Sequence, residues 1–86
     1  MKKVTVYTGP SCPYCVQAKA LLKRKNVAFE EIAVGWDDAA GWDAMMKRSG
    51  GMKTVPQIYI GDELVGGYTD LAALESAGQL DAKLAD

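Results

Sequence analysis

Two cysteines, Cys12 and Cys15, stand three positions apart in the segment GPSCPYCVQA, and the chain of 86 residues has no other cysteine. A pair of thiols at this spacing can exchange a disulfide, bind a metal or staple a loop. The thiolate is the reactive form of cysteine, and a free thiol has a pKa of about 8.5. Which chemistry the pair performs therefore depends on the elements that position the two sulfur atoms.

The elements around the cysteines are a strand and a helix. Residues 3–8 (KVTVYT) alternate and are rich in β-branched and aromatic side chains, which predicts a strand that ends at Gly9. Helical spacing of apolar residues then predicts a helix from about Pro13 to Lys25, with Asn26 as its stop. Its apolar stripe consists of Cys15, Ala18, Leu21 and Leu22. Cys12 falls at the N-cap of this helix and Cys15 in its first turn.

The remaining elements complete one small domain. The sequence predicts a strand over 27–34, a helix capped by Asp37 or Asp38 and closed by Gly50-Gly51, strands over 54–60 and 63–65 around the turn Gly61-Asp62, a helix capped by Thr69 or Asp70, and a short helical segment through Leu80 and Leu84. The order is β-α-β-α-β-β-α. A strand–helix–strand start implies a parallel crossover, and the hairpin adds antiparallel strands. We expect one α/β domain over residues 1–86, with a four-stranded mixed sheet between helices.

The start of a helix gives the two cysteines different roles. Unpaired N–H groups and the positive end of the helix dipole stabilise an anion, and they can lower a cysteine pKa to roughly 3.5–7.5. Six of the ten basic residues lie in the first 25 positions, where no acidic residue occurs. Cys12 is therefore predicted to be the nucleophile. Cys15 is predicted to be more buried, as suits a resolving thiol.

Three other interpretations of the cysteine pair explain less. A structural disulfide would close a very short loop and stabilise the fold by roughly 2 kcal/mol. A zinc site normally needs four ligands, and the chain offers two cysteines and no histidine. Two small core residues that happen to be cysteine leave the helix-start position unexplained. A redox dithiol without a metal is the interpretation that we favour.

Composition and charge exclude several classes of protein. Hydrophobic residues make up 49% of the chain, and the net charge is -1, which argues against a nucleic-acid binder driven by bulk charge. The N-terminus has no pattern of an export signal, and no stretch approaches the roughly 20 apolar residues of a membrane span. We expect a cytoplasmic monomer with no membrane partner, in a compartment that keeps thiols reduced.

Three motifs occur along nearly the whole chain, and together they resemble a known family. They are Cys12-Pro13-Tyr14-Cys15 after a strand ending in Tyr7-Thr8, then Thr54-Val55-Pro56, and finally Gly66-Gly67-Tyr68-Thr69-Asp70-Leu71. In this order they resemble the dithiol (class I) glutaredoxins of bacterial type. The resemblance implies a thioredoxin-like fold, a redox-active Cys12–Cys15 disulfide, and glutathione as the co-substrate.

The resemblance also implies a glutathione site. Its residues are Tyr14, Thr54, Val55, Pro56, Gly67, Thr69 and Asp70. A cis Val55–Pro56 bond would let the Val55 backbone pair with the cysteine moiety of glutathione. The amides of Thr69 and Asp70 would bind the γ-glutamyl carboxylate, and the Asp70 side chain would pair with its ammonium. Family members often carry a lysine in the place of Gly9, so Lys53 is the candidate for a partial substitute.

The implied activity is that of a glutathione-disulfide oxidoreductase. It would reduce protein disulfides and glutathione mixed disulfides, and so serve electron transport and cell redox homeostasis. Two alternatives stay open at this point. One is a redoxin that thioredoxin reductase supplies with electrons, and the other is a carrier of an iron–sulfur cluster.

Overall fold

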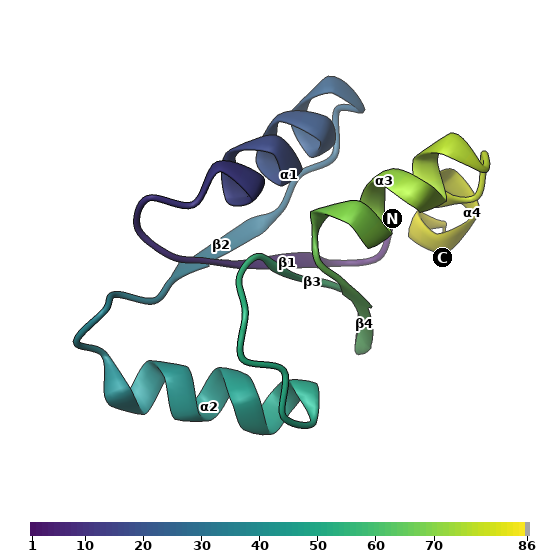
Figure 1. Ribbon diagram of the computed structural model, residues 1–86. Coiled ribbons are helices and arrows are strands. Elements are labelled where there is room, and N and C mark those ends of the chain that lie inside the picture. The colour runs from purple at the N-terminus through teal and green to yellow at the C-terminus, as the bar shows by residue number, and fades with distance from the viewer. Residues whose placement is uncertain (86) are drawn as a thin grey trace.

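The computed structural model describes residues 1–85 and contains a sheet of four strands with helices on both faces (Figure 1). The elements in chain order are β1 (Val4–Thr8), α1 (Pro13–Arg24), β2 (Glu30–Ala33), α2 (Ala39–Ser49), β3 (Gln57–Ile60), β4 (Glu63–Gly66), α3 (Tyr68–Ser76) and α4 (Leu80–Leu84). Figure 1 shows α2 on one face of the sheet and the other helices on the opposite face. The predicted element order is confirmed, with α4 as the expected last segment.

The strands are arranged β2-β1-β3-β4. β1 pairs with β2 in parallel, which is the expected crossover through α1. β1 pairs with β3 and β3 with β4 in antiparallel fashion, so the mixed sheet is also confirmed. Because β1 and β2 are parallel, the loops that follow both strands leave the sheet at the same edge, and the loop after β1 leads directly to Cys12.

The apolar stripe of α1 packs on the sheet as predicted. Ala18 and Leu22 are fully buried, and they join Val6 and Ile58 of the sheet and Leu71 of α3 in one core cluster. On the opposite face α2 contributes the buried Met45. Burial of a Leu, Ile or Val side chain stabilises a fold by about 1.5–3 kcal/mol, so this core anchors the helix that begins at the cysteines.

Two predicted strands begin later in the structure than the pattern indicated. The strand predicted over 27–34 starts at Glu30, because the backbone N–H of Val27 donates to Leu22 in the turn that follows α1. Asn26 adopts a positive φ of 58° in this turn and ends the helix as predicted. The strand predicted over 54–60 starts at Gln57, which is the first residue of β3 to pair with β1. Thr54, Val55 and Pro56 therefore lie outside the ladder.

The start of α3 also differs from the prediction. Gly67 is its N-cap, and Thr69 and Asp70 lie inside the first turn rather than at the cap. Asp70 still caps the helix, since its carboxylate oxygen accepts a hydrogen bond of 3.0 Å from the backbone N–H of Gly67. This is the carboxylate half of a capping box, which favours an acidic residue at the third helical position. At α2, by contrast, Asp38 is the N-cap and Gly50 the left-handed C-cap, as predicted.

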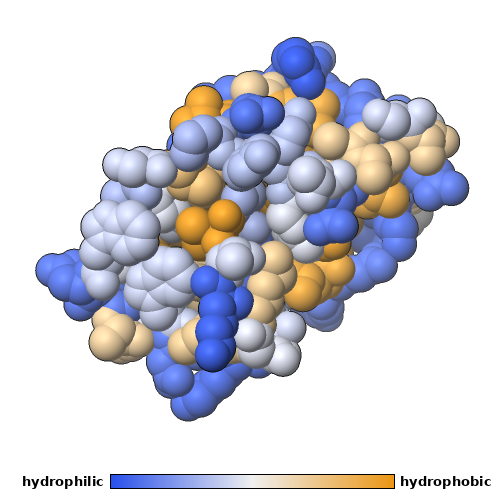
Figure 2. All heavy atoms as spheres, in the orientation of Figure 1, coloured by the Kyte–Doolittle hydropathy of each residue, from blue (hydrophilic) through white to orange (hydrophobic). Residues whose placement is uncertain are grey.

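The surface shown in Figure 2 is largely hydrophilic. Apolar side chains occur on this face as small separate groups and do not form one broad patch. The exposed large hydrophobic residues of the described chain are Met1, Tyr14, Val16 and Trp36. Two of them, Tyr14 and Val16, flank Cys15 along α1. No helix within residues 1–85 combines the length and the apolar character that crossing a membrane requires.

Candidate active site

The first turn of α1 holds both cysteines, and in this structure they form a disulfide. Cys12 is the N-cap with extended backbone, and Pro13 follows it at the first helical position, where its missing N–H costs nothing. The backbone N–H of Cys15 donates to Cys12 Sγ at 3.1 Å. Cys15 is 2% exposed, whereas Cys12 is only half-buried, so the predicted difference in burial is confirmed.

This geometry favours negative charge on Cys12 once the disulfide is reduced. The first turn of α1 contains no acidic residue, and the last turn carries Lys23 and Arg24, which complement the opposite end of the dipole. The N–H of Cys15 points at the sulfur of Cys12 and would donate to a thiolate there. The more exposed of the two sulfur atoms therefore has the stronger anion-stabilising surroundings.

The segment before β3 forms the wall opposite Cys12. Cys12 Sγ lies 3.7 Å from the carbonyl oxygen of Val55, and the Val55–Pro56 peptide bond is cis. Val55 is half-buried and lies outside the sheet, so its backbone groups are not used by the β3 ladder. The cysteine pair at the start of α1 and the Thr-Val-Pro segment, with β2 and α2 between them along the chain, thus meet in space.

Gln57 holds this segment in place. Its side chain is fully buried, and Nε2 donates to the carbonyl oxygens of Met52 at 2.9 Å and Thr54 at 3.0 Å. Its Oε1 atom has no hydrogen-bond partner within residues 1–85. Buried polar atoms are rarely left unpaired, and an amide is buried at this position because its Nε2 atom donates two hydrogen bonds to the groove wall. Gln57 was not predicted as a site residue, although it directly follows Pro56.

Gly9 also contacts this wall. A Cβ atom at this position would lie 3.1 Å from the Cγ2 atom of Val55, closer than side chains normally approach. A larger residue at Gly9 would therefore push on Val55. The exposed Lys53 lies in the adjoining loop, which keeps it as the candidate for the missing positive charge.

A groove of about 210 Å³ lies beside the cysteines. Its lining residues are Tyr14, Thr54, Val55, Pro56, Gly67, Tyr68 and Thr69. Six of the seven residues that the sequence analysis assigned to glutathione line this one groove. The seventh, Asp70, does not line it and instead caps Gly67 at the groove's edge. Tyr68 was missed. Its ring stacks on that of Tyr14, with centroids 6.2 Å apart, and joins the two helices that flank the groove.

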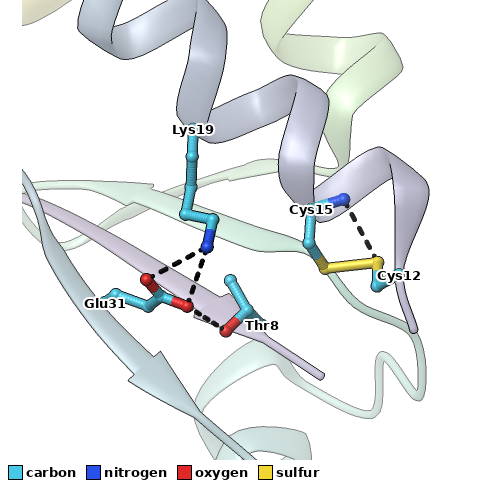
Figure 3. Close-up of polar contacts among 5 residues, drawn as sticks. All are labelled: Thr8, Cys12, Cys15, Lys19 and Glu31. Atoms are coloured by element: carbon cyan, nitrogen blue, oxygen red, sulfur yellow. Dashed lines mark hydrogen bonds and ion pairs between the residues drawn. A yellow bond between two sulfur atoms is a disulfide. The ribbon is translucent and has the colours of Figure 1, made fainter. Parts of the chain in front are cut away.

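A second hollow, the β2-side cavity, opens on the cysteines without sharing a lining residue with the groove. It has a volume of about 460 Å³ and is lined by Thr8, Gly9, Ser11, Cys12, Pro13, Cys15, Val16, Lys19 and Glu31. Its two charged residues form an ion pair, with Lys19 Nζ 3.1 Å from a carboxylate oxygen of Glu31. Thr8 donates to the same carboxylate at 2.8 Å (Figure 3). The hydrogen bond from Thr8 and the ammonium of Lys19 lower the pKa of Glu31.

Within residues 1–85, no group of three or more histidine, cysteine, aspartate or glutamate side chains is placed so that it could hold a metal ion. The polar groups near the cysteines include a backbone carbonyl, a helix N-terminus and one neutralised ion pair. This donor set suits thiol–disulfide exchange and the binding of an extended peptide-like molecule in the groove.

Comparison with known proteins agrees with this chemistry. The family model described as Glutaredoxin matches residues 4–65. The chain is 52% identical over 84 residues to a glutaredoxin of Pseudomonas aeruginosa, covering 98% of both chains, and 48% identical over 84 residues to glutaredoxin 3 of Escherichia coli, covering 98% of this chain and 99% of that one. The solution structure of glutaredoxin from Brucella melitensis matches with a TM-score of 0.82 and 49% identity, over 98% of this chain and 89% of that chain.

The likeness to solved structures also confirms the thioredoxin-like fold. A crystal structure of a buckwheat glutaredoxin–glutathione complex matches with a TM-score of 0.83 over 96% of this chain and 76% of that chain, and at 23% identity this likeness concerns the fold alone. The match to the family model and the relatives near 50% identity go further than the fold. They show that the chain belongs to the glutaredoxin family of thiol–disulfide oxidoreductases.

Proposed function

We propose that the protein is a glutathione-dependent oxidoreductase that reduces protein disulfides and glutathione mixed disulfides through its Cys-Pro-Tyr-Cys dithiol. The observation that carries the proposal is the groove beside Cys12, which gathers six of the residues assigned to glutathione from three separate segments of the chain. The substrates are glutathionylated and disulfide-containing proteins, and the reaction takes place in the cytoplasm.

The groove supports a definite pose for glutathione. The cysteine moiety of glutathione pairs with the backbone of Val55. Because Cys12 Sγ lies 3.7 Å from the Val55 carbonyl oxygen, this pairing brings the sulfur of glutathione toward Cys12. The γ-glutamyl carboxylate binds at the N-terminus of α3, whose first backbone N–H groups and dipole favour an anion. Asp70 uses one carboxylate oxygen to cap Gly67, and its other oxygen pairs with the ammonium group.

With a glutathione mixed disulfide, Cys12 alone carries out the exchange. The Cys12 thiolate attacks the glutathione sulfur, a new disulfide forms between Cys12 and glutathione, and the substrate leaves as a thiolate that takes up a proton. A second glutathione, as thiolate, then attacks the glutathione sulfur on Cys12. It leaves as oxidised glutathione and returns Cys12 to the thiolate.

With a protein disulfide, both cysteines take part. Cys12 first forms a mixed disulfide with one sulfur of the target, and the other target sulfur leaves as a thiol. Cys15 then loses its proton and attacks Cys12, so the Cys12–Cys15 bond forms and the target is released fully reduced. The state with a Cys12–Cys15 disulfide is the one that the structure holds. Two molecules of glutathione supply the two electrons that reduce it.

The test is NADPH-coupled turnover of a glutathionylated peptide with glutathione and glutathione reductase. Cys12→Ser is expected to abolish turnover, whereas Cys15→Ser is expected to turn the peptide over and to lose the reduction of a protein disulfide. If the wild type is inactive in this assay but accepts electrons from thioredoxin reductase, the glutathione proposal is wrong. A coloured protein that carries iron and sulfide after purification would instead support the cluster carrier.

A further inference from the structure

The β2-side cavity gives Cys15 surroundings that the proposed reaction does not yet use. Cys15 is 2% exposed, and this cavity reaches it away from the groove where glutathione is proposed to bind. The resolving step requires Cys15 to lose a proton beside this cavity. The charges that line the cavity therefore bear on when Cys15 becomes reactive.

The Lys19–Glu31 ion pair supplies those charges. Lys19 follows Cys15 by four residues on α1, so the two side chains are neighbours on one face of the helix. Figure 3 shows Lys19 reaching from this face to Glu31 on β2, while Cys15 points toward the same side. The contacts from Lys19 Nζ to the two Glu31 oxygens are 3.2 and 3.1 Å, and Thr8 fixes the carboxylate from β1.

One further charge on α1, that of Lys23, also acts on Glu31, as a weaker influence than Lys19. The titratable groups on the other elements around Cys15 are engaged elsewhere. On α3, Tyr68 stacks on Tyr14 in the groove, Asp70 caps Gly67, and Glu75 pairs with Lys25 at the far end of α1. On β3, Tyr59 packs against Arg48 of α2, and on β2 Glu30 pairs with Lys3. Within residues 1–85, Lys19 and Glu31 are thus the only charged side chains that line the cavity at Cys15.

We propose that Lys19 and Glu31 are a pair of positioning residues that balance each other's charge beside Cys15 and so keep it a thiol until Cys12 carries a mixed disulfide. The inference rests on the proposed dithiol function. A lone ammonium in the cavity would favour the Cys15 thiolate, and a lone carboxylate would disfavour it. The balanced pair leaves burial as the main influence on Cys15, while the helix N-terminus activates Cys12.

This balance orders the chemical steps. In the resting dithiol only Cys12 is ionised, so the first attack on a target comes from the more exposed sulfur. In the mixed disulfide, Cys15 gives its proton to solvent in the cavity, its sulfur forms the Cys12–Cys15 bond, and the bond from Cys12 to the target breaks. The target sulfur takes the electron pair of the broken bond and then a proton.

The proposal predicts opposite effects for the two single variants. Lys19→Met leaves Glu31 with only the weaker influence of Lys23 and is expected to raise the pH midpoint of Cys15 ionisation. Glu31→Gln leaves Lys19 uncompensated and is expected to lower it. Each shift should be about half a pH unit to one unit, since one charge of a partly exposed pair acts across about one helical turn. The double variant restores neutrality and is expected to return the midpoint to that of the parent.

The experiment measures the rate of alkylation of Cys15 by iodoacetamide as a function of pH, with the product followed by mass spectrometry. It is done in a Cys12→Ser parent, in which Cys15 is the single thiol. Glu30→Gln is the matched control. It removes the neighbouring carboxylate, which pairs with Lys3 at 3.3 Å and does not line this cavity. Circular dichroism of each variant checks the fold.

Opposite shifts with recovery in the double variant, and an unshifted control, are the expected result. Shifts of the same sign, no shift in either variant, or a double variant that departs further from the parent would overturn the proposal, because damage to the fold adds up and does not cancel. Alkylation needs no glutathione. If the wild type shows no turnover with glutathione, the proposed function is refuted, but the pH midpoints of Cys15 ionisation stay the same.

Discussion

Asp70 is predicted to have two separable roles, one in folding and one in binding. Its carboxylate accepts a 3.0 Å hydrogen bond from Gly67 at the start of α3, and its charge lies at the positive end of the helix dipole. Loss of a helix cap costs about 1 kcal/mol, and loss of a charge at an exposed helix end costs about 0.3–1 kcal/mol. Asp70→Ala should therefore lower the free energy of unfolding by about 1.5 kcal/mol.

Asp70→Asn distinguishes the two roles. The asparagine oxygen can still accept from Gly67, so the free energy of unfolding should fall only by about 0.5 kcal/mol. Both variants lose the proposed ion pair with the ammonium of glutathione. An exposed pair of this kind contributes at most about 1 kcal/mol, which corresponds to a rise of up to about fivefold in KM for glutathione.

Urea denaturation and steady-state kinetics with varied glutathione measure the two effects separately. The expected result is a stability loss confined mainly to Asp70→Ala and a similar rise in KM in both variants. If Asp70→Asn binds glutathione as the wild type does, Asp70 makes no ion pair with the substrate. If KM rises only in the alanine variant, Asp70 acts on binding through the cap and the loop that it holds.

Three further outcomes follow from buried and paired side chains. Leu22→Ala should lower the free energy of unfolding by about 3 kcal/mol in urea denaturation, because Leu22 is fully buried. Gln57→Leu removes the two hydrogen bonds to the groove wall and should raise KM for glutathione about fivefold in steady-state kinetics. Thr8 and Lys19 lower the pKa of Glu31 below its ordinary 4.5, so Glu31 stabilises the fold above pH 4.5, and this contribution disappears as the pH falls through the lowered pKa. Glu31→Gln should therefore lose stability near neutral pH and approach the wild type in acid, as measured by unfolding at a series of pH values.

The sequence predicted the fold well where its signals are local. Asn26 stops α1 with a left-handed backbone, and Gly50 does the same for α2, because these turns depend on single residues. The predicted starts of two strands, at residues 27 and 54, were too early, because these strands begin at Glu30 and Gln57. An apolar run such as 27–29 fits a strand by composition, but its backbone is used by a turn that only the packed helix defines.

The candidate site was predicted in part for a similar reason. Cys12 and Cys15 are close in sequence, so a helix start was enough to distinguish their burial. Glu31, Lys19 and Gln57 were missed, because each acts through a contact with a distant segment. Nothing in the sequence of this strand shows that Glu31 pairs with Lys19 on the neighbouring helix, whereas Glu30 pairs with Lys3.

The place of β3 in the middle of the sheet affects how the groove moves. β3 pairs with a strand on each side, and all four of its residues are buried, whereas β2 lies at an edge and is largely exposed. Amide protons of β3 should thus exchange with solvent only when the whole molecule opens, while those of β2 exchange through local fluctuations. Because Pro56 leads directly into β3, we expect the wall that faces Cys12 to be held in position by this strand. Substrates then bind to a surface that is already formed.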